Sequence, residues 1–505
     1  MNTFLFSPIV ELSPVFPEIG FLVSLIGILF LEFFSTQVDS KLIFSFILLA
    51  FVWAFGTTAL SMVNINEMFF SETTVFFNAF HETGTSLIFR LLILLSSFFC
   101  FFLAFGYLKK RDFVLVEFSV LFLFFVLSSL ILCGAKNLLL VFLALEGVSF
   151  SSSLLIGLFK QDFRANEASL KYFFMGGLSS ALLVYSFSFM YGLSNGSLDI
   201  DDLSFIFSLS TAESVNNGNG FLGSFPFLCL FFGLAFKLSL VPFHYWTPDV
   251  FEGSPAPILG LLSVPSKVAY SAFFFTICQT VFVGALPWKS ILEFSLILNL
   301  LIGTFVSLNQ MTLKRFLGYS SIGQGGFLLM GLLLFDSKGL ENFFVYFFVY
   351  AISTLGILSC VTYFGMKTGK DTLKGFSEIG ERDPLLAVLL SFFLLSLCGL
   401  PPFAGFFAKL YLFLSTWNAN LKFLVFIGFL CTVISLYFYL RIIKTMLVDK
   451  KSENTGDIEY SPLQFSKIFN SPLEFNIFFC SILNILGGIF FPLWVPALTN
   501  FLGFI

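Results

Sequence analysis

The sequence predicts an all-α polytopic membrane protein with about 14 transmembrane helices. Hydrophobic residues make up 57% of the 505-residue chain, charged residues make up 11%, and the mean hydropathy is +0.96. Soluble domains are about a quarter charged. Apolar runs of about 20 residues recur along the chain, separated by short polar breaks. Two of these runs are interrupted by proline at corresponding positions, which indicates two inverted five-helix repeats with broken helices 7 and 12.

Charged or Gly/Pro/Asn-rich breaks define the predicted spanning segments. In chain order these are residues 17–35, 42–62, 87–107, 114–133, 137–159, 168–192, 221–247, 256–280, 288–309, 314–335, 341–366, 384–417, 420–445 and 473–500. The polar interruptions between them are too short to hold a soluble domain.

Counting the helices in blocks of five divides the chain into four parts. We expect an N-terminal three-helix segment at 1–110, a first repeat (helices 4–8) at 111–282, a second, inverted repeat (helices 9–13) at 283–446, and a loop with helix 14 at 447–505. Lys and Arg concentrate in the connections after odd-numbered segments, for example at Lys109 and Arg111. The positive-inside rule then places both termini on the side opposite the cytoplasm or matrix.

The two interrupted segments each carry a lysine near the interruption. Pro242 follows Lys237 in the seventh segment, and Pro401 and Pro402 precede Lys409 in the twelfth. A proline in mid-membrane frees a backbone carbonyl, which is tolerated only against protein or a wet cavity. Interrupted helices in two halves of a chain point to a transport site near the midplane.

Three lysines lie within apolar segments: Lys237, Lys267 and Lys409. A lysine at the centre of a spanning helix opposes insertion by roughly 2.5–3.5 kcal/mol, so stability does not explain them. Lysines linked by water and hydroxyl groups form a chain along which protons can pass. Lys267 lies close enough to a segment end that a snorkelling side chain is the alternative interpretation.

Glu146 lies in mid-span on the fifth segment and is the expected partner of Lys237. A buried carboxylate and a buried lysine keep each other charged, and separating them would favour release of the lysine proton. The alternative is a static ion pair that joins helices 5 and 7.

Other polar residues carry weaker predictions. His244, just past Pro242, is a candidate gate for protons, and a structural hydrogen bond is the alternative. Arg90, Lys136 and Lys171 lie near segment ends and are expected to be interfacial anchors. The glycine-rich stretch 323–326 indicates a close helix contact rather than a phosphate loop.

Composition excludes several classes of function. The net charge of −4 gives no support to nucleic-acid binding. The eight cysteines lie singly, without a C-x-x-C pair, and the two histidines show no ligand spacing, so no metal or redox cofactor is expected in this chain. The N-terminus lacks a cleavable signal pattern, and 79 phenylalanines suggest an organelle-encoded gene.

Three stretches carry a family resemblance: FKLSLVPFHYWTPDVFEGSPAP at 236–257, NQMTLKRFLGYSSIGQGGFLLMG at 309–331 and SLCGLPPFAGFFAKLYLF at 396–413. Together they resemble NADH dehydrogenase subunit 2, an antiporter-like membrane-arm subunit of the proton-pumping NADH:ubiquinone oxidoreductase, respiratory complex I. FEGSP and the lysine of GFFAK favour subunit 2 over the related subunit 4. The resemblance implies 14 helices, with inverted repeats in helices 4–8 and 9–13.

The resemblance also implies roles for single residues. Glu146 would pair with Lys237, Lys267 would be the central lysine, and Lys409 would be the lysine nearest the proton exit. Gln324 stands where many members of the family carry histidine, so water or Gln324 itself would have to bridge the central and exit lysines.

The function implied is proton translocation driven by quinone reduction elsewhere in a large complex. NADH, FMN, iron–sulfur clusters and ubiquinone would bind to partner subunits. Expected partners are other complex I subunits, especially subunit 4 and the small membrane subunits, together with lipids.

The expected location is the mitochondrial inner membrane, with the termini on the intermembrane-space side, and the alternatives are a bacterial plasma membrane or a plastid thylakoid. Two other functions stay open: a stand-alone or Mrp-type cation/proton antiporter, and a purely structural scaffold.

Overall fold

The computed structural model describes most of the predicted membrane region. It covers residues 13–34, 39–67, 73–75, 79–108, 115–204, 220–281, 288–334, 337–369, 372–448, 462–463 and 471–491. Lys109, Arg111, the predicted boundaries at 110/111 and 282/283, and most of 447–505 lie outside these residues. The division of the chain into four parts therefore stays a prediction.

The N-terminal part and the first repeat are helical, apart from one short hairpin. The N-terminal elements are η1 (Ser13–Val15), α2 (Phe16–Phe34), α3 (Ser40–Glu67), the antiparallel strands β1 (Thr73–Val75) and β2 (Phe80–Glu82), and α4 (Gly84–Leu108). The first repeat holds α5 (Leu115–Gly134), α6 (Leu138–Ile156), α7 (Phe163–Leu193), α9 (Gly220–Lys237), α10 (Trp246–Gly253), α11 (Ala256–Ser263) and α12 (Pro265–Thr280).

The second repeat and the C-terminal part are helical throughout the described residues. They hold α13 (Trp288–Ser307), α14 (Leu313–Leu332), α15 (Ser337–Thr368), η2 (Leu373–Glu378), α16 (Ile379–Arg382), α17 (Pro384–Cys398), α18 (Ala404–Asn418), α19 (Lys422–Leu447) and α20 (Pro472–Ile489). Helix starts follow local capping rules, because the side chains of Asn137, Asp162 and Asp383 accept bonds from the first-turn N–H groups of α6, α7 and α17.

The predicted number of spans agrees with the structure. In the described part of the chain, 11 helices are long and apolar enough to cross a membrane, counting α11 and α12 as one crossing. The pairs α9/α10 and α17/α18 and the helix α14 supply further crossings, which is consistent with about 14.

Both predicted breaks are confirmed. Helix α9 ends at Lys237 and α10 begins at Trp246, while α17 ends at Cys398 and α18 begins at Ala404. A third break, between α11 and α12 at Val264, was not predicted from the sequence. Pro265 is the first residue of α12, where its missing N–H costs no helical hydrogen bond.

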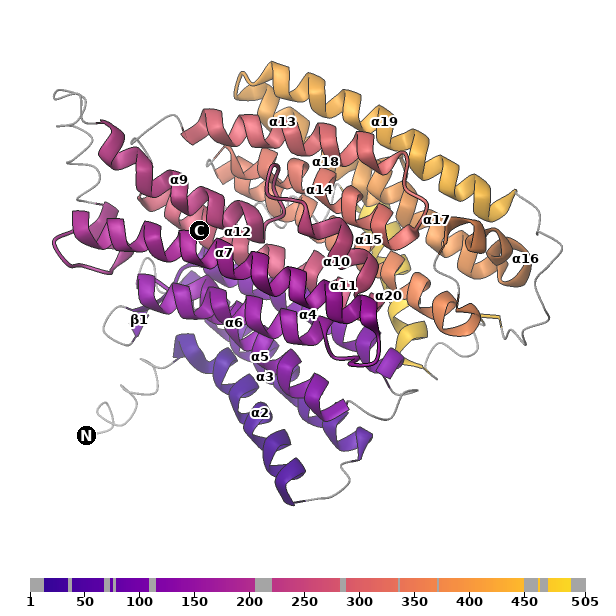
Figure 1. Ribbon diagram of the computed structural model, residues 1–505, viewed down its shortest axis with the longest axis horizontal. Helices are drawn as coiled ribbons and strands as arrows, with labels where there is room; N and C mark the ends of the chain where they lie inside the picture. Colours follow the sequence, from indigo (N-terminus) through magenta and orange to yellow (C-terminus); the bar gives the residue numbers. More distant parts are fainter. Residues whose placement is uncertain are drawn as a thin grey trace.

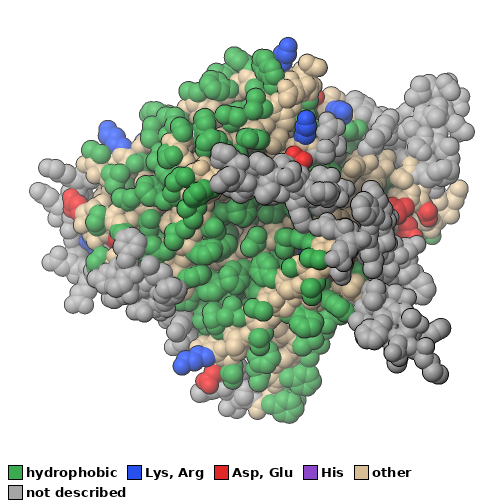
Figure 2. Space-filling view, turned by 180° about the vertical axis from the view of Figure 1, so that it is seen from behind, with side chains coloured by type: hydrophobic (Ala, Val, Ile, Leu, Met, Phe, Trp, Pro, Cys, Tyr) green, Lys and Arg blue, Asp and Glu red, His purple; other side chains and the backbone are tan. Residues whose placement is uncertain are grey.

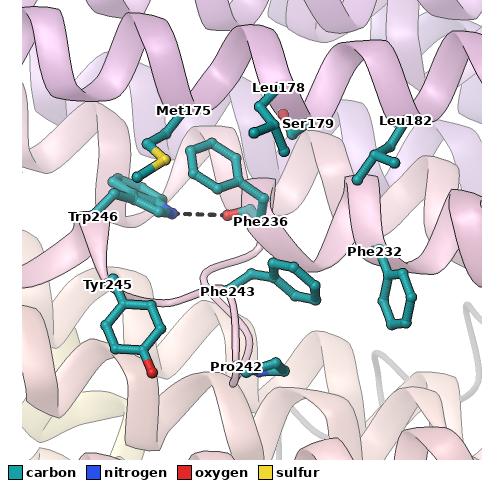
Figure 3. Close-up of a pocket in the computed structure, with 10 residues that line it drawn as sticks. All are labelled: Met175, Leu178, Ser179, Leu182, Phe232, Phe236, Pro242, Phe243, Tyr245 and Trp246. Atoms are coloured by element: carbon teal, nitrogen blue, oxygen red, sulfur yellow. Dashed lines mark hydrogen bonds between the residues drawn. The ribbon is translucent and has the colours of Figure 1, made fainter.

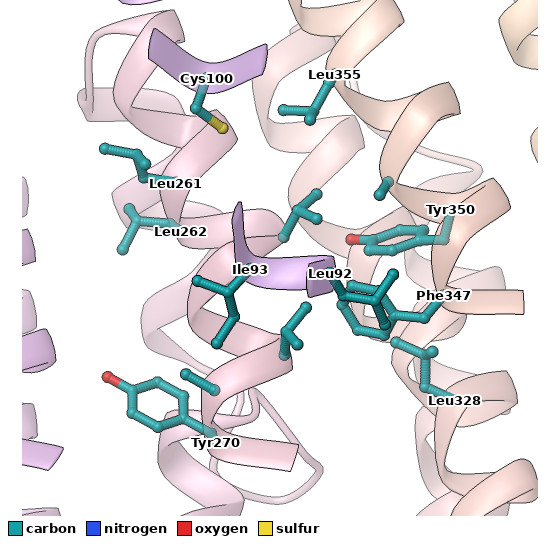
Figure 4. Packing of buried hydrophobic residues seen from close by; sticks show 14 of the residues in the cluster. Leu92, Ile93, Cys100, Leu261, Leu262, Tyr270, Leu328, Phe347, Tyr350 and Leu355 are labelled. Carbon is teal, nitrogen blue, oxygen red and sulfur yellow. The ribbon is translucent and has the colours of Figure 1, made fainter. Parts of the chain in front are cut away.

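The core lies where α4, α11, α12 and α15 meet, between the N-terminal helices and α19 (Figure 1). An 18-residue stretch within 256–280 is 100% buried, against 33% for one within 13–34. Figure 4 shows this packing, with side chains of α4, α11, α12, α14 and α15 interlocked: Leu92, Ile93, Cys100, Leu261, Leu262, Tyr270, Leu328, Phe347, Tyr350 and Leu355. This core includes α12, which carries Lys267, and borders α9, which ends at Lys237.

The outer face is apolar, as expected of a surface in contact with lipid or membrane partners. Hydrophobic side chains cover the middle of the face in Figure 2, and Lys, Arg, Asp and Glu lie towards its edges.

The glycine-rich stretch makes the predicted helix contact. A Cβ atom at Gly303 of α13 would overlap the backbone of Gly323 on α14, and one at Gly326 would meet Leu300 at 2.9 Å. These small residues allow α13 and α14 to approach closely.

The prediction for Arg90 is wrong. Its side chain is fully buried in α4 rather than placed at an interface, and its guanidinium forms ion pairs with Glu18 at 3.1 Å and Glu82 at 3.3 Å. The two carboxylates make burial of this cation possible. Glu18 is too distant in sequence to be recognised by local pattern, whereas Glu82 lies only eight residues before Arg90, in the strand that precedes α4. Lys136 and Lys171 do lie at partly exposed helix ends, paired with Asp201 and with Asp249.

Candidate functional site

Lys237 and Glu146 form the expected pair. Lys237 is the last residue of α9, its side chain is 1% exposed, and its Nζ donates to Glu146 Oε1 at 3.2 Å. The same Nζ donates to the Leu145 carbonyl at 3.2 Å and the Ser149 hydroxyl at 3.3 Å, so one turn of α6 holds the ammonium group. The Glu146 side chain is 34% exposed, which leaves part of this carboxylate on the surface of the chain.

Lys267 is buried at the start of α12, one turn after the break at Val264. Its Nζ donates to the Ser321 carbonyl of α14 at 3.0 Å, and the residue is 4% exposed. The side chain therefore contacts the second repeat and does not extend to the surface of the chain. No carboxylate among the described residues lies within 4.0 Å of its ammonium.

The Lys409 side chain binds the end of the helix that precedes its own break. Its Nζ donates to the carbonyls of Leu397 at 2.7 Å and Cys398 at 3.1 Å, both at the end of α17. These carbonyls lack helical partners because α17 stops there. The Phe327 ring lies 4.8 Å from the same Nζ, and the residue is 4% exposed.

Gln324 lies between the second and third lysines. Its Nε2 donates to the Leu397 carbonyl at 3.4 Å, the same oxygen that accepts from Lys409, and to the Tyr439 hydroxyl at 3.4 Å. The Tyr346 hydroxyl donates to its Oε1. Gln324 follows Ser321, the acceptor of Lys267, by one turn of α14, so a single helix contacts both lysine sites.

Two small cavities lie beside Lys267 and Gln324. One is lined by Leu238, Leu240, Lys267, Ser271 and Gly325, and the other by Ser263, Ser320, Ser321, Gln324 and Tyr350, among others. Each has room for about one water molecule. The first extends from the α9 break to Lys267, and the second extends from the Lys267 acceptor to Gln324.

His244 lies in the first break, as predicted, and is 7% exposed. It stacks on Tyr245 with ring centroids 4.8 Å apart, and its Nδ1 has no hydrogen-bond partner among the described residues. The structure does not place it against Lys237 or Lys267. A role for His244 as a proton gate or in a structural hydrogen bond stays a prediction.

A groove of about 280 Å³ borders the same break on its outer side (Figure 3). It is lined by Met175, Leu178, Ser179, Leu182, Phe232, Phe236, Pro242, Phe243, Tyr245 and Trp246. The walls are almost entirely apolar and hold none of the four relay candidates. At its edge the Trp246 indole donates to the Phe236 carbonyl at 3.0 Å, which supplies a partner to one carbonyl near the end of α9.

Asn299 of α13 was missed from the sequence. It is fully buried, and its Oδ1 accepts from the backbone N–H of Val241 at 2.6 Å. The helix break removes the normal partner of that N–H. A single asparagine in an apolar run of a different repeat gave no local signal for this contact.

Charged residues also join the repeats at the helix ends. Asp249 and Glu252 of α10 pair with Arg315 of α14 at 3.5 and 3.1 Å, and Asp249 also pairs with Lys171 of α7 at 3.2 Å. Exposed pairs of this kind contribute about 0–1 kcal/mol each, so they align the helices more than they stabilise them.

Within the described residues, no group of three or more His, Cys, Asp or Glu side chains is arranged to hold a metal ion. The eight cysteines are buried and free. That no cofactor binds to this chain stays a prediction.

Comparison with known proteins decides the family. Residues 135–435 match the family described as NADH:quinone oxidoreductase/Mrp antiporter, transmembrane region. The chloroplastic NAD(P)H-quinone oxidoreductase subunit 2 of Mesostigma viride is 40% identical over 421 residues, 83% of each chain. The corresponding subunit of Chara vulgaris is 34% identical over 95% of each chain. The chain belongs to the NAD(P)H-quinone oxidoreductase subunit 2 family. The resemblance predicted from the three motifs is therefore confirmed.

Solved structures share the fold of this subunit 2 homologue. A chain of respiratory complex I from Thermus thermophilus matches with a TM-score of 0.75 and 24% identity, covering 95% of this chain and 99% of that one. A chain of the archaeal membrane-bound sulfane sulfur reductase matches at 0.82 with 20% identity, over 98% of each chain. A chain of the Mrp complex from Dietzia matches at 0.81 with 16% identity, over 97% of each chain.

Proposed function

We propose that the chain translocates protons as a membrane-arm subunit of a quinone-reducing NAD(P)H dehydrogenase of the complex I type. Its relatives are subunits of NAD(P)H-quinone oxidoreductase, so the enzyme activity belongs to the whole complex. The donor, FMN, iron–sulfur clusters and quinone are proposed to bind to partner subunits. The relay within this chain runs through Glu146, Lys237, Lys267 and Lys409.

One observation supports the relay above the others: buried contacts join Glu146 to Lys237 and, through α14, bring Lys267 and Lys409 together. Lys237 contacts α6, Lys267 contacts α14, and α14 contacts the carbonyl that Lys409 also binds. Burial of three lysines in this way is costly, and a static scaffold gains nothing from the series.

Proton movement would begin at Glu146. While the Glu146 carboxylate contacts Lys237, it stabilises the protonated form of the lysine. When the carboxylate moves away, Lys237 is a buried cation without a counter-charge, so it releases its proton. Lys267 receives the proton across the first small cavity. The Ser321 carbonyl, which accepts from Lys267, then directs the proton towards Gln324 and Lys409.

Gln324 replaces the histidine expected between the central and exit lysines. A glutamine amide does not titrate, so it cannot carry a proton as an imidazole does. We propose that Gln324 orients water and the Tyr346 and Tyr439 hydroxyls, and that water in the second cavity carries the proton.

Partner subunits would cover the face of α6 that carries Glu146. Leu139, Leu143 and Phe150 on this helix are each at least 50% exposed, and Glu146 lies among them. A carboxylate facing lipid at this depth is costly, which favours a protein neighbour such as subunit 4 or a small membrane subunit. A photoreactive residue at Leu143 should crosslink to a partner subunit. A photoreactive residue at Phe429 of α19, which is also exposed, is the matched control.

The proposal also concerns which membrane holds the complex. The relatives matched here are chloroplastic, which favours a plastid thylakoid over the mitochondrial inner membrane expected from the sequence. Native gels of separated organelle membranes, stained for NAD(P)H dehydrogenase activity and probed for this chain, would decide between them.

The relay is tested with Lys237→Met in membrane vesicles that retain the assembled complex. We expect quinone-dependent proton uptake, followed with a pH-sensitive dye, to fall about tenfold or more, because the first lysine of the series can no longer hold a proton. Lys136→Met, at a partly exposed helix end, is the matched control and should pump normally. Unchanged pumping in an assembled Lys237→Met complex would sink the relay and favour a structural role for the lysines.

An Mrp-type antiporter is the second candidate, because the Mrp chain shares this fold. A redox-independent antiporter would exchange Na⁺ or K⁺ for protons in vesicles without NAD(P)H or quinone. Co-purification of the chain with NAD(P)H dehydrogenase activity, and no cation exchange without substrate, is the result that the complex I assignment requires.

A further inference from the structure

A second group of buried charges lies outside the proposed relay, where α2, α4 and β2 meet. The Arg90 guanidinium is fully buried and contacts Glu18 Oε1 at 3.1 Å and Glu82 Oε1 at 3.3 Å. Its Nη1 also donates to the Pro14 carbonyl at 3.0 Å, and the Phe80 ring lies 4.8 Å from its Cζ. The Glu18 and Glu82 side chains are 6% and 4% exposed.

The charges in this group do not balance if both carboxylates are ionised. One guanidinium faces two carboxylates, which leaves one buried negative charge without compensation. Such a charge is strongly disfavoured in a low-dielectric interior, and a carboxyl group removes it by taking up a proton.

The proton belongs to the pair of carboxyl groups rather than to one of them. Ser61 of α3 hydrogen-bonds to the Glu82 carboxyl group, a contact that favours its ionised form. Arg90 Nη1 also donates to Glu82 Oε1, at 3.3 Å. Two buried carboxylates that share one cation cannot both stay ionised at low cost, so they hold one proton between them.

We propose that Glu82, Glu18 and Arg90 form a proton-binding site in which the two carboxyl groups share one proton, and that this site fastens α2 and α3 to α4. In this arrangement one carboxyl group is ionised and pairs with Arg90, while the other holds the proton. Losing the proton would leave a buried negative charge where the N-terminal helices meet the rest of the chain, and would weaken that junction.

The surroundings of the site are compatible with this assignment. Glu82 lies outside the spanning helices, and burial raises its pKa, although Arg90 partly offsets the shift. Among the described residues, the other titratable groups packed here are Cys133 of α5 and His81 of β2, which are 5% and 3% exposed. His81 precedes Glu82 in the strand, so strand alternation directs the two side chains to opposite faces.

The pH dependence follows from the sign of this shift. A carboxyl whose native pKa is raised contributes stability below its ordinary value of about 4.3 and loses it as the pH rises through the native value. The thermal midpoint of the assembled complex should therefore fall as the pH rises, and Glu82→Gln should remove the part of that fall that comes from this site.

The experiment compares variants of the full complex in native membranes. Gln carries the same neutral hydrogen-bonding group as the protonated acid, so Glu82→Gln should assemble normally, match the wild type at low pH and melt about 2–4 °C higher than the wild type at high pH. The double variant Glu18→Gln/Glu82→Gln should not assemble, because Arg90 then has no carboxylate. Asp201→Asn, an exposed carboxylate at 61%, should keep the wild-type pH dependence.

Two results would overturn the proposal. If Glu82→Gln fails to assemble, or keeps the wild-type pH dependence, the carboxyl pair holds no proton in the native state. If His81→Gln removes the pH dependence instead, a histidine cation supplies the missing charge and the proton is not on the carboxyl pair. Because none of these residues belongs to the relay, the results are independent of whether the relay carries protons.

Discussion

The two helix breaks hold their lysines in different ways. At the first break, Lys237 donates to a carboxylate and a hydroxyl on α6, and Asn299 of α13 accepts from the freed Val241 N–H. At the second break, Lys409 donates to the freed carbonyls of its own break, Leu397 and Cys398. No carboxylate of the described residues lies within 4.0 Å of Lys409.

The difference shows how one type of break can serve two purposes. The first lysine faces a charge on another helix, so motion of α6 changes the stability of its ammonium form. The second lysine faces fixed backbone dipoles, so its surroundings change only if the break itself moves. The first site is therefore suited to receiving a coupling signal, and the second is suited to a fixed position at the end of the series.

Removing Lys409 should have the largest effect on stability. Lys409→Met leaves the buried Cys398 carbonyl without a donor, at about 1–3 kcal/mol, and leaves the Leu397 carbonyl with only the 3.4 Å bond from Gln324. We expect a marked drop in the thermal midpoint of the complex and loss of pumping. Lys409→Gln restores a neutral donor, and should recover the midpoint without recovering pumping. Equal midpoints for the Met and Gln variants would show that the lysine does not cap the break.

Loss of the Asn299 contact should have the next largest effect on stability. Asn299→Leu leaves the Val241 N–H buried without an acceptor and should cost about 1–3 kcal/mol. Asn299→Asp keeps an acceptor oxygen and should recover part of the loss in a thermal-shift measurement. Thr304→Val on the same helix removes only a bond within α13 and is the control. A Thr304→Val effect as large as that of Asn299→Leu would contradict a specific role for the cap.

Glu146 should matter more for pumping than for stability. Because the Glu146 side chain is one-third exposed, Glu146→Gln should lower the free energy of unfolding by less than the roughly 3–5 kcal/mol that breaking a fully buried ion pair costs. Lys237 keeps its bonds to the Leu145 carbonyl and Ser149 in this variant. Initial rates of proton uptake in vesicles should nevertheless fall, and Glu146→Asp should keep part of the rate. A pumping rate unaffected by Glu146→Gln would favour the static ion pair.

Gln324 should have the smallest effect on stability and a distinct effect on pH dependence. Gln324→His places a group that titrates near neutrality beside the Leu397 carbonyl. We expect pumping to continue and its rate to acquire a new pH dependence between about pH 5 and 8. Gln324→Leu removes the contacts with Leu397 and Tyr439 and should slow pumping at every pH. Normal pumping by Gln324→Leu would remove this residue from the path.

The sequence by itself determined the membrane class, the two proline breaks and the three buried lysines. These features are local: an apolar run of about 20 residues, a proline inside it, or a lysine within it can be recognised without knowing any neighbour. The pairing of Glu146 with Lys237 was also accessible, because a lone carboxylate and a lone lysine in apolar segments each need a partner. The three motifs then identified the family.

The tertiary structure decided which groups meet across the repeats. Asn299 and Val241 are 58 residues apart, Gln324 and Leu397 are 73 apart, and Arg90 and Pro14 are 76 apart. An asparagine in an apolar run or an arginine near a segment end has the same local pattern whether it anchors a helix or caps a distant break. Arg90 was assigned to an interface for this reason, and only the folded chain brings Glu18 and Glu82 to it. The physical cause is that hydropathy depends on a residue and its sequence neighbours, whereas a buried polar group is satisfied by whichever helix packs against it.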